Sequence, residues 1–386
     1  MKIIIYGLGS GLEYIERNLR EDNEIVGYSD SYADIGVFNG QPFYKPDKLK
    51  DVEYDFLILA IRNRKEAWRV YELLTGNRYG LDEKKVIPFY SYASAEYWDE
   101  CLAHAPYQKI EGLIFGTSYA RLGILPEYLS RTFINLGVPS QDLYGDLMTF
   151  RACISKYPEK LRELKYIILD MFDYNYFNFD TSLCKLFFTH LEFGGIQEEH
   201  NFAQNSNYGG NFIIELEARL GIRRDEKKKE LLSKMFYESY AIDKPLDAEN
   251  RFKGIDCSAD FPAGFFEARV IKVYDENTVG QNKRNLEQLL NEIWKWNPDI
   301  KVVMVLFPKY ITFEETSKTF METWKNDFLG VLEDFTKRKN LYFWNYKFCK
   351  GIVDNERFWA DVSHLNTMGA RCMSSIIEGD LRREIY

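Results

Sequence analysis

The stretch LIFGTSYARLGI, residues 113–124, decides how the larger part of the chain folds. Its apolar start predicts a buried strand, and Gly116 followed by the small polar pair Thr117 and Ser118 predicts a tight turn into a helix. Ser118 is therefore expected where a strand ends and a helix begins. A serine at that point either caps the helix or serves as a nucleophile, and this stretch alone leaves both interpretations open.

Apolar runs alternate with amphipathic segments from this stretch to the end of the chain. Strands are expected at IEGLIFG, TFINLG, YIILDM, KVVMVLFP and LYFWNY, and helices at PEYLSR, QDLYGDLMTFRACISKY, NKRNLEQLLNEIWKW and TWKNDFLGVLEDFTKRK. This order predicts a parallel sheet with helices on both faces, over residues 110–386. Residues from about 178 to 262 interrupt the rhythm. They are expected to form an insertion, either a lid over the carboxyl ends of the strands or an extra stabilising layer.

The beginning of the chain shows the same alternation on a smaller scale. Strands are expected at KIIIYG, EIVGYSD, DFLILAI and KVIPFY, and helices at the segment after Leu12 and at RKEAWRVYELL. The predicted fold class is therefore α/β, with two doubly wound parallel-sheet domains. Their expected boundaries are residues 1–95 and 110–386, joined by a linker over residues 96–109.

A glycine turn, GLGSG, follows the first expected strand. Gly7 and Gly9 fit the first two positions of the dinucleotide-binding pattern G-x-G-x-x-G, but Leu12 occupies the third position. Asp30 ends the second expected strand, near the spacing of a carboxylate that binds a ribose. Two interpretations remain open: a site for a nucleotide or nucleotide sugar at Gly7, Gly9 and Asp30, or glycines that serve only the turn.

The amino-acid composition limits which kinds of molecule the protein is expected to bind. The net charge is −9 and no polybasic segment stands out, which speaks against nucleic acid and anionic membranes. No stretch approaches the roughly 20 apolar residues of a membrane span, and MKIIIYGLGSGLEYIERNL lacks the features of a signal peptide. We therefore expect a cytoplasmic protein without a transmembrane segment. The six cysteines form no CxxC pair or zinc-type spacing, so no metal site is expected.

His364 has the most suggestive surroundings of the four histidines. It lies in FWADVSHLNTMGA, near the start of the expected final helix, and Asp361 stands three residues before it. In a turn, that spacing lets the carboxylate hold Nδ1–H and leaves Nε2 to face a nucleophile. The alternative is that Asp361 or Ser363 caps the final helix and His364 is a surface residue.

The joint placement of GTS after the first strand and DVSH after the last resembles the SGNH hydrolase superfamily over residues 110–386. The ending DVSHLNTMGA is similar to a subgroup of polysaccharide O-acyltransferases and esterases that includes teichoic acid D-alanyl-transfer proteins. The resemblance implies a flavodoxin-like three-layer sandwich in which Ser118, His364 and Asp361 are catalytic. Residues 1–95 resemble the Rossmann-like domains of bacterial sugar-modifying enzymes, on the segments KIIIYGLG, IVGYSD, GQPF and YDFLILAI.

The same resemblance suggests an oxyanion hole built from the backbone N–H groups of Ser118 and Gly137, the latter in NLGVPSQD. The family's G-x-N-D block, whose Asn completes that hole, is missing. The corresponding segment ILDMFDYN offers Asp170, Asp173 and Asn175, of which only Asn175 carries a side-chain amide donor.

The resemblance implies a serine esterase or O-acyltransferase that acts on acyl groups of a carbohydrate, without a required cofactor. A nucleotide or nucleotide sugar would be an additional ligand of the first domain. The main alternative is a non-catalytic, glycan-binding protein of polysaccharide assembly, which the missing G-x-N-D block favours. A nucleotide-sugar oxidoreductase or epimerase is disfavoured by Leu12 and by the small first domain. The oligomeric state, the acyl group and the sugar are not specified by the sequence.

Overall fold

A computed structural model describes the chain except residues 10, 63, 94–96, 106–109, 182–224 and 238–274. Contacts divide it into two compact units. One comprises the described residues of Met1–Ala95 and Gly209–Lys244, and the other those of Glu96–Tyr208 and Pro245–Tyr386. Each unit has its own sheet, so the predicted α/β class with two sheet domains is confirmed.

The first unit is built on a six-stranded sheet of order β3-β4-β2-β1-β5-β6. Only the hairpin of β3 and β4 is antiparallel. The strands are β1 (Lys2–Tyr6), β2 (Glu24–Ser29), β3 (Val37–Phe38), β4 (Gln41–Tyr44), β5 (Phe56–Leu59) and β6 (Val86–Pro88). Because β2 and β5 flank β1 on opposite sides, the strand order reverses at β1, where doubly wound sheets form their binding crevice.

Alternate residues of β1 pack on opposite faces of this sheet, as the pleat requires. Ile3 and Ile5 join a core with the helices α1 (Leu12–Asn18) and α3 (Phe89–Ala93). Ile4 and Tyr6 join a core with α2 (Arg64–Thr75) and the short 3-10 helix η1 (Pro46–Asp51).

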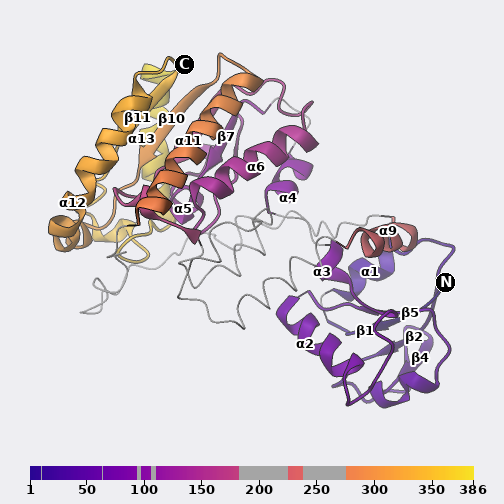
Figure 1. Cartoon of the computed structure of the whole chain (residues 1–386). Helices are drawn as coiled ribbons and strands as arrows, with labels where there is room; N and C mark the ends of the chain where they lie inside the picture. Colours follow the sequence, from indigo (N-terminus) through magenta and orange to yellow (C-terminus); the bar gives the residue numbers. More distant parts are fainter. Residues whose placement is uncertain (10, 63, 94–96, 106–109, 182–224, 238–274) are drawn as a thin grey trace. The chain divides into compact units, whose positions relative to one another are not determined.

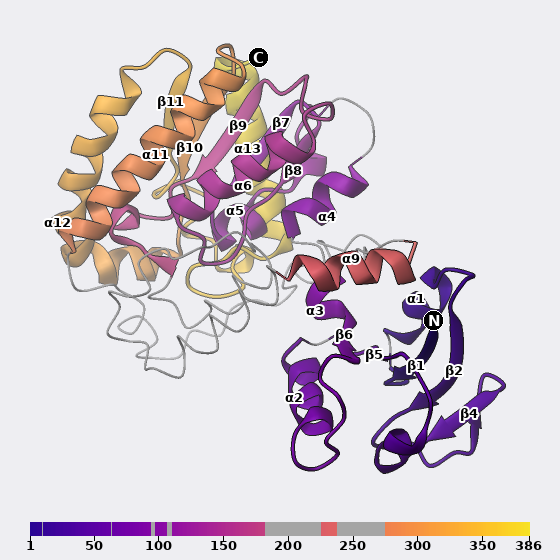
Figure 2. The same cartoon turned by 45° about the vertical axis from the view of Figure 1, so that its right-hand side comes forward.

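A helix from the middle of the chain completes the first of these cores. α9 (Glu226–Met235) lies beside α1 and α3 (Figures 1 and 2). Leu232, Met235 and Phe236 are buried there. The sequence places this segment in an insertion of the second domain. Residues 225–237 of that insertion pack on the first unit instead, and the rest of residues 182–262 lies outside the described residues.

The second unit contains a five-stranded parallel sheet of order β11-β10-β9-β7-β8. Its strands are β7 (Gly112–Phe115), β8 (Phe133–Asn135), β9 (Tyr166–Asp170), β10 (Lys301–Leu306) and β11 (Leu341–Asn345). All five expected strands are present. The order reverses at β7, so the loops that follow β7 and β9 meet at a second crevice.

Helices cover both faces of this sheet (Figure 1). One face packs against α4 (Tyr97–His104), α6 (Leu143–Lys156), α11 (Glu276–Trp296) and α12 (Ile311–Thr336), and the other against α5 (Ser118–Gly123) and α13 (Thr367–Glu384). Helix α4 falls within the expected linker and buries Trp98 and Leu102 in this core. The helix expected at PEYLSR is wrong, because only the 3-10 turn η2 (Pro126–Tyr128) forms there.

Candidate active site

The turn between β7 and α5 presents Ser118 at the carboxyl end of the sheet. Gly116 adopts φ +120°, and a Cβ there would lie 2.5 Å from Cβ of Asp170, so only glycine fits. Thr117 caps α5, since its Oγ1 accepts a hydrogen bond from the N–H of Tyr119 at 3.2 Å. Ser118 is the first residue of the helix. The capping interpretation of Ser118 is therefore wrong: Thr117 has that role, and the Ser118 hydroxyl makes another contact.

That contact is with His364, which lies 246 residues further along the chain. Ser118 Oγ is 2.8 Å from His364 Nε2, and His364 Nδ1 is 2.9 Å from Asp361 Oδ2. The three side chains form one continuous hydrogen-bonded chain from hydroxyl to carboxylate. Asn366 caps α13 through a 3.0 Å bond from the Gly369 N–H, so neither Asp361 nor Ser363 is the cap of the final helix.

The loop before α13 fixes the Asp361 carboxylate. Oδ1 accepts the backbone N–H groups of Ser363 and His364 at 2.8 and 2.9 Å, and the Ser363 hydroxyl at 3.0 Å. Burial alone would raise the pKa of Asp361. The contacts with His364 and Ser363 outweigh burial and hold this pKa well below its usual range. Asp361 is therefore ionised at neutral pH and oriented toward the imidazole.

Two buried carboxyl groups hold the turn that carries Ser118. Asp146 accepts the N–H of Gly116 at 3.0 Å. Asp170 accepts the N–H and the hydroxyl of Thr117 at 3.0 and 2.6 Å, and the N–H of Ala120 at 3.2 Å. Neither acid is ion-paired within the described chain, and burial raises the pKa of both, that of Asp146 to about 8. From the sequence, Asp170 was expected only as one of three candidates for the missing G-x-N-D block, and Asp146 had no expected role.

The three expected oxyanion donors differ in their surroundings. Ser118 begins α5, so its N–H has no partner within the helix. Gly137 lies close to the turn, where an added Cβ would be 3.1 Å from the Thr117 carbonyl, but its N–H donates to Asn135 Oδ1 at 3.0 Å. Asn175 is 3% exposed, and its Oδ1 has no hydrogen-bond partner within the described residues. The oxyanion role of all three stays a prediction.

Aromatic rings pack directly against the imidazole. The Tyr119 ring is stacked on His364, with centroids 5.1 Å apart and planes at 14°. Phe172, whose centroid is 5.4 Å from that of Tyr119, has φ +54°, a strained conformation for a bulky residue. Lys309 Nζ lies 5.4 Å from the Tyr119 centroid and 4.9 Å from that of Phe172. These contacts restrict how far the imidazole ring can turn.

Lys309 belongs to a fully buried charge cluster that the sequence analysis missed. Asp173 pairs with Lys309 and, at 2.7 Å, with Lys347, which also pairs with Glu314 at 2.9 Å. Burial would raise the pKa of Asp173, but the two lysine charges reverse that effect and lower it. A sequence signal does exist: Asp173, Lys309 and Lys347 each follow one of the adjacent strands β9, β10 and β11. In a parallel sheet such residues share one edge.

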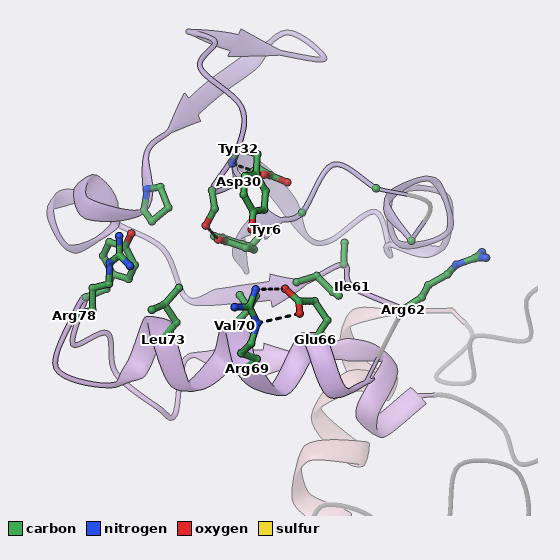
Figure 3. Close-up of a pocket in the computed structure, with 17 residues that line it drawn as sticks. Tyr6, Asp30, Tyr32, Ile61, Arg62, Glu66, Arg69, Val70, Leu73 and Arg78 are labelled. Carbon is green, nitrogen blue, oxygen red and sulfur yellow. Dashed lines mark hydrogen bonds and ion pairs between the residues drawn. The ribbon is translucent and has the colours of Figure 1, made fainter. Parts of the chain in front are cut away.

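In the first unit, the expected ligand residues line one cavity of about 730 Å³ at the carboxyl ends of β1, β2 and β5 (Figure 3). Gly7, Gly9 and Asp30 are all in its wall. Gly7 needs its φ of +102°. Asp30 Oδ2 accepts the N–H of Leu8 at 3.1 Å, and Oδ1 accepts that of Tyr32 at 2.8 Å.

The third glycine of the turn is Gly11 and not position 12, where the G-x-G-x-x-G pattern would place it and where Leu12 stands. Gly11 makes the close approach between helix and strand instead. A Cβ at Gly11 would collide with the carbonyl oxygen of Ala60 and lie 2.6 Å from the Tyr90 ring. The close approach of helix and strand that the third glycine of a dinucleotide-binding turn permits is permitted here by Gly11, one residue earlier.

The described residues also bear on whether the protein holds a metal ion and whether it crosses a membrane. In the part of the chain that the structure describes, no three His, Cys, Asp or Glu side chains gather to hold a metal ion. No helix among the described residues has the length and apolar character to cross a membrane. The absence of a metal requirement and the cellular location stay predictions.

Comparisons with known proteins add a family match in the first unit. No curated protein matches the chain. One similar solved structure, from Streptococcus pneumoniae and provisionally described as a platelet activating factor, is 12% identical with a TM-score of 0.36, over 74% of this chain and 89% of that one. Another, from Bacteroides fragilis and provisionally described as an acylhydrolase, is 12% identical with a TM-score of 0.35, over 74% and 95%. Residues 1–87 match the family described as C2185-like, N-terminal.

Proposed function

We propose that the second unit is a serine esterase or O-acyltransferase in which Ser118 is the nucleophile, His364 the general acid and base, and Asp361 its orienting carboxylate. The observation that carries this proposal is the hydrogen-bonded chain of 2.8 and 2.9 Å through the two nitrogens of His364. A helix-capping role for Ser118 and a surface role for His364 would not require this alignment. The nucleophile, base and orienter geometry is the recognised signature of acyl transfer.

The first half of the reaction acylates Ser118. Its Oγ attacks the ester carbonyl carbon while His364 Nε2 takes the hydroxyl proton, and the ionised Asp361 stabilises the imidazolium. The tetrahedral intermediate then collapses: the bond to the leaving alcohol oxygen breaks, and His364 returns the proton to that oxygen. An acyl-enzyme and a free alcohol result.

The second half removes the acyl group. Water or an acceptor hydroxyl gives its proton to His364 and attacks the acyl carbon, after which Ser118 leaves and recovers the proton. In both halves the negative oxygen needs donors, and each one is worth about 3–4 kcal/mol of barrier. The Ser118 N–H is the first candidate. Gly137 can serve only if its bond to Asn135 opens, and Asn175 supplies an amide whose oxygen is unpaired among the described residues.

We propose that the substrate is an O-acylated carbohydrate, either a surface polysaccharide or its precursor. This part of the proposal rests on the resemblance of DVSHLNTMGA to polysaccharide-modifying enzymes. Release of acetate from acetylated glycans, measured with and without added sugar acceptor, separates hydrolysis from transfer.

The experiment that tests the chemistry compares Ser118→Ala with Ser375→Ala on an aryl acetate. Ser375 is an exposed serine of α13 whose hydroxyl bonds only its own helix. We expect turnover to vanish in Ser118→Ala and to persist in the control. A serine-directed phosphonate should add its mass to Ser118. Activity of a folded Ser118→Ala variant, or phosphonate on another serine, would remove Ser118 as the nucleophile. A parent chain that turns over no ester would favour the alternative of a glycan-binding protein without catalysis.

A further inference from the structure

The cavity of the first unit has a position and a size that suit a small ligand. It lies where the strand order reverses, between the loops after β1 and β5. Ligands of open α/β sheets bind at such points. Its volume of about 730 Å³ falls within the usual range for small-molecule sites, roughly 300–1,000 Å³. Nothing in the proposed esterase chemistry uses this cavity.

The glycine turn is poorly suited to hold an anion. The Gly7 N–H donates to the Ser29 carbonyl and the Leu8 N–H to Asp30, so two of its amides are already engaged. The Asp30 carboxylate also places a negative charge beside the turn. Helix α1, with seven residues, is too short to offset that charge. Gly7 and Gly11 are accounted for by backbone conformation and close packing.

Positive charge lies on the opposite wall of the cavity. The lining includes three arginines and two carboxylates, and of the arginines Arg62 points away from the cavity (Figure 3). Arg69 makes a bidentate pair with Glu66, at 3.0 and 2.6 Å. Arg78 is exposed at one end of the cavity and has no carboxylate partner in the described chain (Figure 3). Its guanidinium lies 5.4 Å from the centroid of the Tyr79 ring.

Groups that suit hydroxyls and flat rings lie nearer the turn. Figure 3 shows Asp30 and Tyr32 together across the cavity from α2. The two backbone bonds fix the Asp30 carboxylate, and each of its oxygens keeps a lone pair for a ligand hydroxyl. The Tyr32 side chain is 90% exposed and can stack on a planar group.

We propose that this cavity binds a phosphate ester that carries free hydroxyls, as sugar phosphates and nucleotides do. The phosphate lies beside Arg78, with Arg69 next to it, and a pair of hydroxyls binds Asp30. The phosphate thus binds beside Arg69 and Arg78, on the side of the cavity opposite the glycine turn, and not at the turn itself. Guanidinium groups bind phosphate through charge-assisted hydrogen bonds, and losing one such contact lowers affinity about tenfold or more.

Calorimetric titration of the full chain tests the proposal with four probes: inorganic phosphate, ribose 5-phosphate, a ribonucleoside 5′-diphosphate and the matching unphosphorylated nucleoside. The variants are Arg78→Ala and Asp30→Asn. Arg17→Ala is the matched control, because Arg17 is an exposed arginine of α1 outside the cavity. We expect the phosphorylated sugars to bind at least tenfold more tightly than the nucleoside. Arg78→Ala should reduce their affinity at least tenfold, and Arg17→Ala should not.

The outcomes separate the two sources of the ligand. Equal affinity for ribose 5-phosphate and the nucleotide identifies a sugar phosphate as the ligand. Tighter nucleotide binding identifies a base that stacks on Tyr32. Asp30→Asn should weaken both sugar ligands and leave inorganic phosphate unchanged. The proposal is overturned if no phosphorylated probe binds, if the nucleoside binds as tightly as the nucleotide, or if Arg78→Ala and Arg17→Ala behave alike.

Discussion

Asp146 and Asp170 show how single residues set the geometry of the candidate site. Both are buried carboxyl groups that accept hydrogen bonds from the Gly116–Ala120 segment, and neither has a cationic partner within the described chain. An ion without a counterion is costly in such surroundings, so burial favours the protonated acid. The position of Ser118 therefore depends on groups whose protonation changes with pH.

The first prediction concerns the pH dependence of stability. Burial raises the pKa of Asp146 to about 8, whereas in the unfolded chain an Asp titrates near its ordinary value of about 4. Between these values the folded state holds a proton that the unfolded state has lost, so stability falls as pH rises from about 4 to about 8. Asp146→Asn keeps an acceptor for the Gly116 N–H and cannot ionise. Its stability should vary less with pH over this window.

Chemical denaturation of the parent chain and Asp146→Asn at pH 5 and pH 8 checks this. The stability difference between the two proteins should shift in favour of the variant at pH 8, by an amount on the order of a few kcal/mol. An unchanged difference between the two pH values would show that Asp146 does not titrate in this window.

A second residue-scale prediction addresses the orienting carboxylate. Asp361→Asn should lower turnover by roughly 10⁴-fold, and less than Ser118→Ala does, because the amide favours the wrong tautomer of His364. The measurement is kcat on an aryl acetate, with circular dichroism as the control for folding. Activity within tenfold of the parent would remove Asp361 from the mechanism.

At the same scale, only those residues of the candidate site that have a recognisable local sequence pattern could be predicted from the sequence. Ser118 follows a glycine at a strand end, and Asp361 and His364 are three residues apart, so each was accessible to pattern reasoning. Asp146 and Tyr119 have no such signal. Their roles depend on contacts with residues far away in the sequence, Gly116 and His364 respectively, and on burial that only the folded chain creates.

At the scale of elements, expectation and structure agree where an apolar run is continuous. Every expected strand is present within one or two residues, since a buried parallel strand is apolar throughout. The short hairpin of β3 and β4 was not expected, because its two and four residues are too few for a periodic pattern. PEYLSR failed as a helix because the chain tightens into a single 3-10 turn at Pro126.

The glycine turn after β1 gives a prediction for an element junction. Gly11→Ala should destabilise the first unit by about 1–3 kcal/mol or more, since the added methyl meets the Ala60 carbonyl and the Tyr90 ring and neither can move freely. Gly9→Ala is the matched control: nothing lies within 4 Å of its Cβ position. Its effect should stay below about 0.5 kcal/mol. Thermal unfolding of the two variants decides the matter, and equal effects would contradict the close-packing role of Gly11.

At the scale of the whole molecule, the two units do not follow the order of the sequence, because described residues of Gly209–Lys244 belong to the same unit as those of Met1–Ala95. Both sheets form from continuous stretches, and these were predictable. The packing site of the helix α9 was not predictable, because its EKKKELLSKM sequence is amphipathic and fits any apolar surface. What decides its location is the surface of α1 and α3, where Leu232, Met235 and Phe236 complete a core.

The last prediction tests this return of the chain to the first unit. Phe236 is fully buried, and its ring lies 4.7 Å from that of Phe89. Phe236→Ala should therefore destabilise the first unit by about 3–5 kcal/mol, although the substitution lies far along the chain from β6, which ends at Pro88. Hydrogen exchange should become faster in β1 and β5 and stay unchanged in β9 and β10, because those strands belong to a separate core. Phe348→Ala is the control, since this ring is 57% exposed. Faster exchange in β9 and β10, with β1 protected, would place α9 in the energetics of the second unit and contradict the packing seen here.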